Sequence, residues 1–359
     1  DMKKYKVIAL MSGTSLDGLD LAYCHFTKSS SGWAFEIKNT RQISYGETRR
    51  EALKQAISLP ALEHSQLHNE YGTWLGQQVK DFVIDEGLEV DFVSSHGHTS
   101  HHQPEKGVTW QLGSGQHLAN ACGHMTVCDF RTNDVALRGQ GAPLVPIGDQ
   151  ELFADYTFCL NLGGISNISF QQEGKRIAFD IGVANMLLNH IANNSGLLYD
   201  KGGALAAKGS INIQLLEALN AVPYYQLPIP KSTGYEWFLN ALVPLLEQYP
   251  DTLENLLCTS VAHITDQVAL QLKNYSTPGD NSILVTGGGA LNTYLIGQLT
   301  EKLSDHAKVV VPDKTIVDYK EALVFGLMGA MRLENETNVL ASVTGAERDS
   351  SSGVIYYPA

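Results

Sequence analysis

The stretch Val7-Ile-Ala-Leu-Met-Ser-Gly-Thr-Ser-Leu-Asp-Gly18, near the start of the chain, decides how the rest of the sequence is interpreted. Its first half is a continuous apolar run, typical of a buried strand, and its second half is a polar turn with two glycines. Another apolar run, Leu19–Phe26, follows at once. The stretch therefore predicts a β-hairpin with a glycine-bearing turn at its tip.

The same plan returns in the second half of the chain. Phe158-Cys-Leu-Asn-Leu-Gly-Gly-Ile-Ser-Asn167 again joins an apolar strand, a glycine turn and a second apolar strand. The turn glycines Gly13 and Gly163 lie 150 positions apart. Two copies of one hairpin, each opening one half of the chain, predict a duplicated fold with a cleft between the copies.

Strand-like and helix-like segments alternate along the remaining sequence, which predicts an α/β protein. Further strands are expected at 34–40, 92–95, 108–112, 126–128, 177–180 and 283–285, and helices over 63–86, from about 184, and over 235–247, 253–272, 292–303 and 321–333. The Gly- and Pro-rich stretch Arg138–Pro146 reads as a connecting loop. We therefore expect one domain over 1–135 plus about 310–359, and another over about 136–309.

Composition narrows the class of partner. The 359 residues are 43% hydrophobic and 18% charged, as in a folded protein, and their formal net charge is −13. Such a negative surface repels nucleic acid and anionic lipid, so neither is expected as a partner. Five cysteines without CxxC spacing, and an opening apolar run too short for a signal peptide, favour a cytoplasmic protein with reduced thiols.

The first turn has the residue types of a phosphate-binding loop. Glycines free backbone N–H groups to approach phosphate oxygens, and hydroxyls donate to the same oxygens. The candidates for these contacts are Ser12, Gly13, Thr14, Ser15 and Gly18. Asp17 cannot donate when ionised, so its expected role is to hold Mg²⁺ through water. An ordinary hairpin turn explains the same residues equally well.

Two later turns add nucleotide-binding candidates. Asn161, Gly163 and Gly164 of the second hairpin are placed to contact the same phosphates. In Thr286-Gly-Gly-Gly-Ala-Leu-Asn292 the residues Thr286, Gly287, Gly288 and Gly289 join a strand to a helix and leave room for a flat adenine or ribose. The sequence has no GxxxxGK[ST] and no GxGxxG, so ATP binding would use paired hairpins instead of a P-loop.

Over essentially its whole length the chain resembles the anhydro-N-acetylmuramic acid kinase family. The resemblance depends on segments that occur in the family's order: Met11–Gly18, Ser95–Gly97, Asp129–Arg131, Gly139–Pro146, Asn161–Gly164, Pro230–Gly234 with Glu236 and Trp237, Thr286–Ala290, Glu321–Leu323 and Ser342–Ala346. The resemblance implies a two-domain actin-like ATPase (ribonuclease H-like) fold with an interdomain cleft. It also implies a cytoplasmic homodimer that uses ATP and Mg²⁺ in cell-wall recycling.

The family's catalytic aspartate corresponds here to Asp180, in Ala178-Phe-Asp-Ile-Gly-Val-Ala-Asn185. In a 1,6-anhydro sugar O6 is tied to the anomeric carbon, so there is no free 6-hydroxyl to deprotonate. A base must activate water to attack C1, and the departing O6 then accepts the γ-phosphoryl group. Asp180 suits this role. The other interpretation is an acid at the start of a helix.

The candidate sugar contacts are His96, Arg131, Asn185 and Glu321. Arg131 would pair with the lactyl carboxylate of a muramic acid, and Glu321 would accept bonds from sugar hydroxyls. For both residues a structural ion pair is the alternative. The sequence departs from the family's usual pattern at positions that raise the question of substrate and rate: His98, Ile181, Val183, Ala184 and Tyr235.

Three other functions stay open at this point. The first is a kinase of another amino sugar or hexose with a free hydroxyl, and the second is a sugar-binding relative of reduced activity. The third is an ATP-driven chaperone or filament protein. His96, His98, His101 and His102 also raise a zinc site, but no cysteine or acid lies at a helpful spacing, so a sugar contact or a plain turn is favoured.

Overall fold

The computed structural model describes every residue except 1 and 14, and the chain forms two compact units. Unit 1 comprises residues 1–152 and 319–359, and unit 2 comprises residues 153–318. These limits lie later in the chain than the expected boundaries near 136 and 310. The Gly-rich stretch belongs to unit 1 because Asp134 binds it: Gly141 donates its N–H to Asp134 Oδ2 at 2.8 Å, and the Gly139 N–H donates to the Asp134 carbonyl at 2.8 Å.

The sheet of unit 1 begins with the predicted hairpin. Its strand order is β13-β7-β4-β1-β2-β3. The strands are β1 (Lys3–Met11), β2 (Gly18–Ser29), β3 (Gly32–Ser44), β4 (Phe92–Ser95), β7 (Thr126–Cys128) and β13 (Val354–Tyr356). β1 and β2 pair antiparallel, whereas β4 runs parallel to β1 and β7 parallel to β4. A separate antiparallel pair consists of β5 (His98–Gln103) and β6 (Val108–Leu112).

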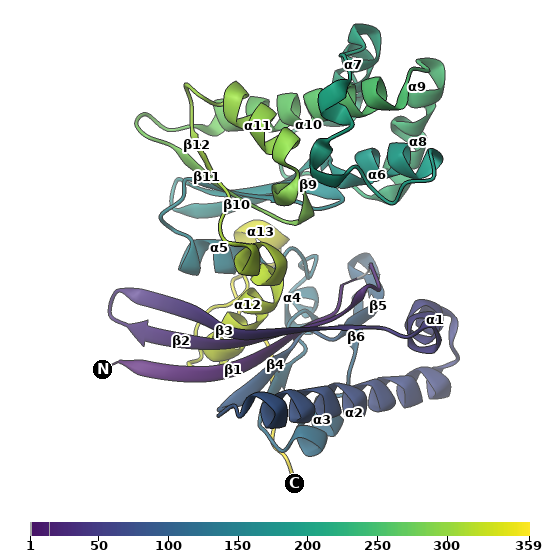
Figure 1. The fold of residues 1–359 in the computed structure, drawn as a ribbon. Helices are drawn as coiled ribbons and strands as arrows, with labels where there is room; N and C mark the ends of the chain where they lie inside the picture. The colour runs from purple at the N-terminus through teal and green to yellow at the C-terminus, as the bar shows by residue number, and fades with distance from the viewer. Residues whose placement is uncertain (1, 14) are drawn as a thin grey trace. The chain divides into compact units, whose positions relative to one another are not determined.

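Helices cover both faces of this sheet (Figure 1). The helices of this unit are α1 (Glu47–Gln55), α2 (Ala61–Glu86), α3 (Gly115–Cys122), α4 (Thr132–Ala136), α5 (Pro146–Leu152), α13 (Ala341–Thr344) and, from Tyr319 onward, α12 (Lys314–Leu333). The apolar side of α2 predicted from its spacing packs with β1 and β2 in one core. On the other face Gly326 of α12 approaches Phe26 and Ala9 closely, which explains the need for a small residue there.

The sheet of unit 2 repeats the order of unit 1. Its order is β10-β9-β8-β11-β12, so in each unit the first strand lies between the second and the fourth. The strands are β8 (Phe158–Leu162), β9 (Ile165–Gln172), β10 (Lys175–Val183), β11 (Ser282–Thr286) and β12 (Lys308–Val310). The first three pair antiparallel, and β11 runs parallel to β8. This shared topology confirms the duplicated α/β fold that the echoed hairpins predicted.

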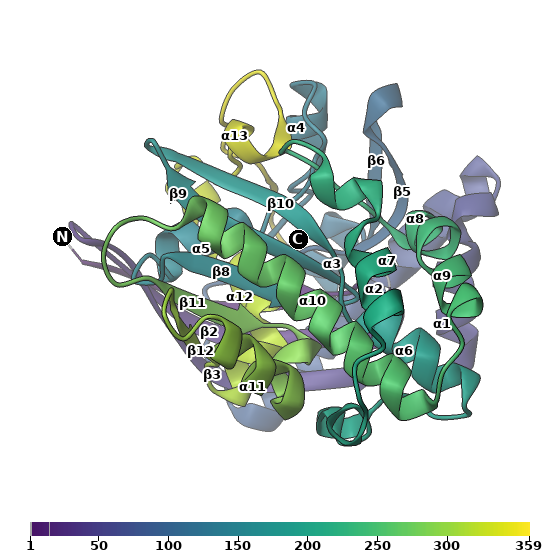
Figure 2. The ribbon, with the colours of Figure 1, turned by 90° about the horizontal axis from the view of Figure 1, so that it is seen from above.

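The helices of unit 2 include a long, deeply buried one, α10 (Leu253–Tyr275), which lies across the sheet beside α11 (Thr293–Lys302) (Figure 2). The others are α6 (Asn185–Asn194), α7 (Ile213–Asn220), α8 (Tyr235–Ala241) and α9 (Val243–Gln248). The expected single helix over 235–247 is therefore broken near Leu242. Pro244 explains the break, because proline lacks an N–H and disfavours a helical residue before it.

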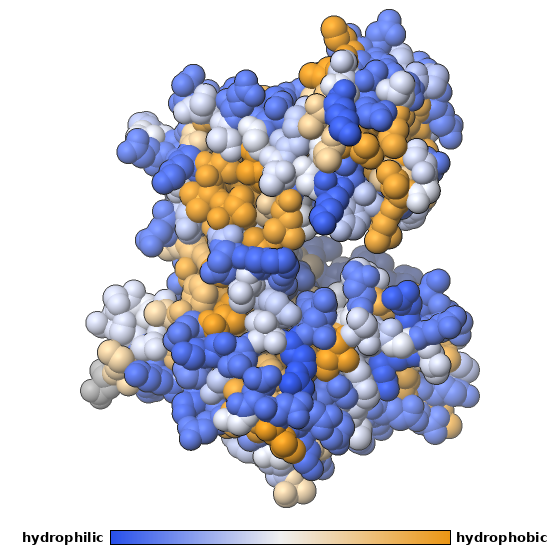
Figure 3. All heavy atoms as spheres, viewed as in Figure 1, coloured by the Kyte–Doolittle hydropathy of each residue, from blue (hydrophilic) through white to orange (hydrophobic). Residues whose placement is uncertain are grey.

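The cysteines, the helices and the surface of the molecule bear on the compartment and the partners expected from composition. All five cysteines are free and buried. None of the helices of the described residues has the length and apolar character needed to cross a bilayer. On the face shown in Figure 3, unit 1 is mostly hydrophilic, and unit 2 has a group of hydrophobic side chains beside α11.

Candidate active site

The turn between β1 and β2 places its polar residues in two different environments. Ser12 is 2% exposed, whereas Ser15 and Asp17 are exposed. Thr14, another phosphate candidate, lies outside the described residues. Leu16 has a φ of 58° and donates its N–H to the Gly13 carbonyl at 3.3 Å. This left-handed conformation is uncommon for leucine and typical of a functional turn. Among the described residues of this turn, Ser15 and Asp17 have exposed side chains that a ligand can reach.

Gly18 has a structural reason to be glycine. A Cβ at this position would lie 2.3 Å from the Ile43 carbonyl oxygen on β3. Gly13 differs, because a Cβ there would meet nothing closer than the Ser15 hydroxyl at 3.8 Å. Sequence alone could not separate these two glycines, since the neighbour of Gly18 is distant in the chain.

Ser12 belongs to a chain of buried polar side chains. Its Oγ lies 3.0 Å from His98 Nδ1 and accepts a hydrogen bond from the Tyr45 hydroxyl at 2.6 Å. The Tyr45 and Tyr71 hydroxyls are 2.5 Å apart. Burial lowers the pKa of His98 to about 4, so the imidazole is neutral at pH 7. We call these four residues the Ser12 chain.

His96 and Arg131 form a buried pair in unit 1. His96 Nδ1 lies 2.7 Å from the Gly97 carbonyl, so it carries the proton, and Nε2 accepts from Arg131 Nε at 3.1 Å and Nη2 at 2.9 Å. Burial, aided by the Arg131 charge, lowers the pKa of His96 to about 3. Arg131 Nη1 donates to the Gly141 carbonyl at 2.7 Å.

The hydrogen bonds to His96 occupy the Nε and Nη2 edge of the Arg131 guanidinium. Because His96 is neutral, it does not neutralise the positive charge of Arg131. Burial lowers the pKa of Arg131 to about 10, and the carboxylates of nearby Glu321 and Asp134 oppose that effect. The group stays cationic at pH 7. Three of the predicted sugar contacts, His96, Arg131 and Glu321, therefore lie near one another in unit 1, although they are far apart in the sequence.

Four polar residues form a row across the sheet of unit 2. Thr286 on β11 pairs with Asn161 on β8, Asn161 with Asn167 on β9, and Asn167 with Asp180 on β10. Residues paired across neighbouring strands point to the same face of a sheet. Asn167 was not among the predicted site residues. Its place next to the turn of the second hairpin, opposite Asn161, is the signal that could have identified it.

Asp180 is held from the backbone of a neighbouring segment. Its Oδ2 accepts the Thr233 N–H at 3.0 Å, its own N–H donates to the Lys231 carbonyl at 3.0 Å, and the Tyr224 hydroxyl donates to its carbonyl at 2.8 Å. Burial raises the pKa of the carboxyl, and the Thr233 hydrogen bond partly opposes this. A half-buried carboxylate with a raised pKa and a free oxygen edge can act as a general base.

The sheet is irregular just after Asp180. A β-bulge separates Asp180 from Gly182, and a Cβ on Gly182 would lie 2.4 Å from the Tyr225 ring. Bulges re-aim side chains and are common beside active sites. The Tyr225 hydroxyl is bonded in turn to Nε2 of buried His263 at 2.8 Å. Gly182 is thus required for packing against Tyr225.

The departures from the family pattern around Asp180 lie in the core. Ile181, Val183 and Ala184 are 0%, 2% and 0% exposed and pack in the main cluster of unit 2. These three substitutions therefore change the packing of the unit 2 core, and none of the three side chains is exposed to a ligand. Tyr235 is different, because it is 60% exposed at the start of α8.

The second hairpin turn supports the start of α6. The Gly164 carbonyl accepts the N–H groups of Ala184 at 2.8 Å and Met186 at 3.1 Å, and the Gly163 carbonyl accepts that of Asn185 at 3.0 Å. The Asn185 amide also donates to the Leu162 carbonyl at 3.0 Å. These contacts satisfy donors that a helix N-terminus otherwise leaves open. The amide oxygen of Asn185 stays available as the predicted sugar contact.

The three glycines after β11 have different reasons to be glycine. A Cβ on Gly287 would lie 2.5 Å from Asn161 Oδ1, and one on Gly289 would lie 2.5 Å from Leu162 Cβ. A Cβ on Gly288 would meet only the Asn185 amide, at 3.7 Å. Close packing on β8 thus explains two of the glycines, and Gly288 alone has space in front of it.

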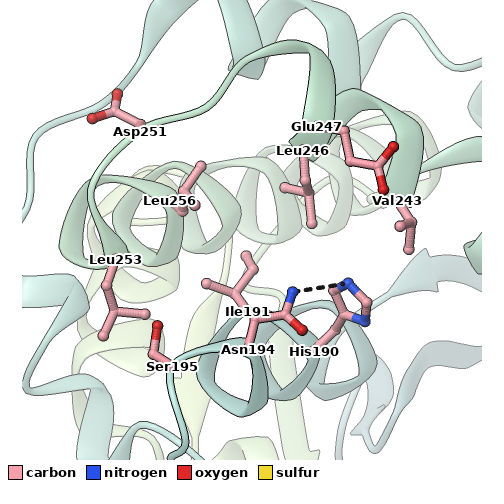
Figure 4. Close-up of a pocket in the computed structure, with 10 residues that line it drawn as sticks. All are labelled: His190, Ile191, Asn194, Ser195, Val243, Leu246, Glu247, Asp251, Leu253 and Leu256. Carbon is pink, nitrogen blue, oxygen red and sulfur yellow. Dashed lines mark hydrogen bonds between the residues drawn. The ribbon is translucent and has the colours of Figure 1, made fainter.

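A cavity of about 210 Å³ lies elsewhere in unit 2, between α6, α9 and α10 (Figure 4). Its floor is apolar, and its edge includes the His190–Asn194 pair, hydrogen-bonded at 3.4 Å. The described residues that line it include none of the predicted site residues. It is also smaller than the roughly 300–1,000 Å³ of ordinary ligand pockets. We therefore do not assign it to the reaction.

The histidines of the predicted cluster have separate environments. Gly97, with a φ of 78°, ends the extended chain between His96 and His98, so the two rings do not share a strand. His96 binds Arg131 and His98 binds Ser12. Within the described part of the chain, no group of three or more His, Cys, Asp or Glu side chains is arranged to hold a metal ion.

Comparison with known proteins adds a family to this geometry. The family model described as anhydro-N-acetylmuramic acid kinase matches residues 5–358. The protein of that name from Nitrosomonas europaea is 36% identical over 97% of this chain and 99% of its own length. The one from Hydrogenovibrio crunogenus is 32% identical over 98% of each chain.

Two solved structures show a weaker likeness. The activator of the 2-hydroxyisocaproyl-CoA dehydratase from Clostridium difficile, with bound ADPNP, has a TM-score of 0.43 and 11% identity, over 92% of this chain and 97% of that one. A chain of the PilM–PilN type IV pilus biogenesis complex has a TM-score of 0.44 and 11% identity, over 90% of this chain and 98% of that one.

Proposed function

Because the chain belongs to the anhydro-N-acetylmuramic acid kinase family, we propose that it uses ATP to convert 1,6-anhydro-N-acetylmuramic acid into N-acetylmuramic acid 6-phosphate, opening the anhydro ring with water. This activity belongs to the recycling of cell-wall sugars. The observation that carries the mechanism is the environment of Asp180. Its carboxyl is half-buried, its pKa is raised, and Thr233 fixes one of its oxygens.

Asp180 acts as the general base in this proposal. It removes a proton from a water molecule as that water attacks the anomeric carbon, and the C1–O6 bond breaks. The released O6 attacks the γ-phosphorus of ATP, and ADP leaves. The raised pKa makes the carboxylate a stronger base than an ordinary exposed aspartate. Thr233 and the Lys231 carbonyl keep it in one orientation.

The phosphates are assigned to the turns. Ser15 and Asp17 of unit 1 are exposed, and Gly163 and Gly164 of unit 2 have room for a close ligand, since a Cβ on either would make no contact under 3.4 Å. Mg²⁺, when bound, neutralises charge on the phosphates. The exposed carboxylate of Asp17 fits the hard oxygen chemistry of that ion and would hold it through water.

We assign the sugar to the cationic group in unit 1. Arg131 keeps its charge beside a neutral His96, so it can pair with the lactyl carboxylate. Glu321 lies close by and can accept bonds from hydroxyls. Replacing Arg131 by Ala is expected to raise KM for the muramyl sugar selectively, and an unchanged KM would exclude Arg131 from the site.

The decisive experiment combines isotope labelling with one substitution. The protein is incubated with ATP and the anhydro sugar in H₂¹⁸O, and the products are analysed by mass spectrometry. Ring opening by water places ¹⁸O at C1, after correction for exchange in the free sugar. Phosphorylation without C1 labelling would indicate a kinase of a sugar with a free hydroxyl, and ATP hydrolysis without sugar would indicate the chaperone or filament class.

The substitution is Asp180→Asn, which keeps the shape and removes the base. General-base catalysis contributes about 10²- to 10⁴-fold, so kcat should fall by about 10³-fold while ATP still binds. Asp305→Asn is the matched control, because Asp305 is an exposed aspartate of unit 2. Comparable kcat in Asp180→Asn and the wild type would exclude Asp180 as the base.

We also propose a cytoplasmic homodimer. ATP is supplied in the cytoplasm, and the five buried, free thiols suit a reducing compartment. Unit 2 carries several exposed hydrophobic residues within 197–213, of which Leu198 (80% exposed) and Ile213 (66%) are the most accessible. Sedimentation should show a dimer for the wild type and a shift toward monomer for Leu198→Asp. A wild-type monomer would contradict the dimer.

A further inference from the structure

Four buried polar side chains from separate parts of unit 1 meet at the end of β1. Ser12 follows β1, His98 begins β5, Tyr45 follows β3, and Tyr71 lies in α2. Their contacts are 3.0 Å for Ser12–His98, 2.6 Å for Ser12–Tyr45 and 2.5 Å for Tyr45–Tyr71. Each of the four is less than 9% exposed. Of the four, only Ser12 was a predicted phosphate contact, and no role in the turn was predicted for His98, Tyr45 or Tyr71.

The directions of these hydrogen bonds follow from the donors. Tyr45 donates its only hydroxyl hydrogen to Ser12 Oγ, so the Tyr71 hydroxyl must donate to Tyr45. His98 is neutral, because burial lowers its pKa to about 4. The Ser12 hydrogen then has an acceptor in His98 Nδ1, and the imidazole carries its proton on Nε2. In this arrangement every hydroxyl hydrogen of the chain is used.

The alternative direction needs a different acceptor for the Ser12 hydrogen. If His98 Nδ1 donated to Ser12, that hydrogen could not go to Tyr45, which already donates to Ser12 Oγ, and would have to turn to the Tyr71 hydroxyl. With His98 Nδ1 as the acceptor, all three hydroxyl hydrogens are paired through the contacts at 3.0, 2.6 and 2.5 Å, and no buried hydrogen is left unpaired. Gly97 also affects the position of His98. A Cβ on Gly97 would lie 2.4 Å from the Leu112 carbonyl oxygen, so residue 97 must be glycine for His98 to pair with Leu112 as β5 begins.

We propose that Ser12 is a positioning residue and does not bind phosphate. Its hydroxyl hydrogen is committed to His98, and through the Ser12 chain it holds the turn 13–17 where the exposed Ser15 and Asp17 can reach the nucleotide. His98 and Tyr45 act on ATP binding only through Ser12. This inference rests on the proposed function, in which the turn after β1 binds the phosphates of ATP.

Steady-state kinetics of matched variants test the proposal. Ser12→Ala and His98→Ala should each raise KM for ATP about tenfold, the effect of about one hydrogen bond, and leave KM for the sugar within about twofold. The double variant should be no worse than either single one, because both remove the same interaction. His98→Gln should restore a near wild-type KM for ATP, because the glutamine oxygen can accept the Ser12 hydrogen.

Two results would overturn the proposal. If Ser12→Ala raised KM for ATP and His98→Ala did not, Ser12 would contact phosphate directly. If the variants lowered only the melting temperature and kcat, the chain would be merely structural, because a smaller folded fraction changes the amount of active enzyme and leaves KM unaltered.

Asp17→Asn separates this proposal from the proposed function. If Asp17→Asn leaves KM for ATP unchanged, the turn does not bind the nucleotide, and the proposed role of the turn fails. If Asp17→Asn raises that KM and the Ser12 and His98 variants do not, only the positioning role fails.

A measurement on the wild-type protein covers the case in which variants do not fold. In a ¹⁵N–¹H spectrum of the histidine rings, His98 should show the tautomer with the proton on Nε2 at pH 7. His98→Gln identifies its signals by their loss. A proton on Nδ1 of His98 would reverse the hydrogen bond to Ser12 and overturn the proposal.

Discussion

The turn after β1 in unit 1 and the turn after β8 in unit 2 occupy the same place in sheets of the same strand order, but they are held in different ways. The first is anchored by buried side chains, Tyr45 and His98, that bind Ser12. The second is anchored by its own carbonyls at Gly163 and Gly164, which accept N–H groups from the start of α6. A duplicated topology thus fixes where a turn lies, and local chemistry decides what holds it.

The largest expected effect concerns packing against the second hairpin. Gly289→Ala would place a Cβ 2.5 Å from Leu162 Cβ and 3.0 Å from its carbonyl oxygen. Overpacking of this kind should lower the free energy of unfolding by about 3 kcal/mol. The urea midpoint of the unit 2 transition, followed by circular dichroism, measures the change.

Gly288→Ala is the matched control for that variant. Its Cβ would make only an ordinary contact with Asn185, at 3.7 Å, so the urea midpoint should stay close to that of the wild type. If Gly288 faces the nucleotide as the sequence predicts, this variant should instead raise KM for ATP. Equal destabilisation by both substitutions would show that close packing on β8 is not what distinguishes these glycines.

A smaller effect is expected from breaking the side-chain anchor of the first turn. Tyr45→Phe removes the donor to Ser12 and the acceptor for Tyr71, two interactions in a buried setting. The free energy of unfolding should fall by about 2 kcal/mol, as measured by urea denaturation. Tyr235→Phe serves as the control, because its side chain is largely exposed and should change stability by less than about 0.5 kcal/mol. If Tyr45→Phe were as stable as this control, the Ser12 chain would not stabilise the turn.

The smallest expected effect is on how the free energy of unfolding depends on pH. The sign of this dependence differs between His98 in unit 1 and Asp180 in unit 2. His98 has a lowered pKa, about 4 against an ordinary 6.5, so the unfolded chain binds the proton more tightly. Stability from neutral His98 is present above pH 6.5 and is lost as pH falls toward 4. At pH 5 the loss should be at most about 2 kcal/mol, and it should be absent in His98→Gln.

Asp180 titrates in the opposite sense. Its folded pKa is raised above the ordinary 3.8, so the folded chain binds the proton more tightly and stability falls as pH rises through that pKa. Asp180→Asn should therefore be more stable than the wild type at pH 7, with an advantage that shrinks below pH 4. Urea midpoints across pH 3.5–7.5 for both variants measure the two slopes, and slopes of the same sign would contradict this account.

Much of the fold was predictable because its signals are local. The apolar runs with glycine turns predicted both hairpins, and the spacing of apolar residues predicted α2 and α10, with ends a few residues from the observed ones. The short elements α1, β5 and β13 were not predicted. β13 has three residues and pairs with β7, a partner more than 220 positions earlier, so nothing near it in the sequence marks it as a strand.

The candidate site was predictable in its residue types and less so in its geometry. Asp180 was named from its motif, but its contacts with Thr233 and Lys231 come from a segment some 50 residues later. Asn167 was missed, because its place beside Asp180 depends on the pairing of β9 with β10. The roles of these residues stay predictions until the variants are measured.

By itself the sequence determined the duplicated α/β plan, the family and the residue types at the turns, because each is written in short stretches of the chain. Only the tertiary structure decided which of those residues face solvent and which are occupied by partners. Ser12 and Asp17 are five residues apart in one motif, yet one is buried against His98 and the other is exposed. Burial is set by residues brought from elsewhere in the chain, and these cannot be read from the motif.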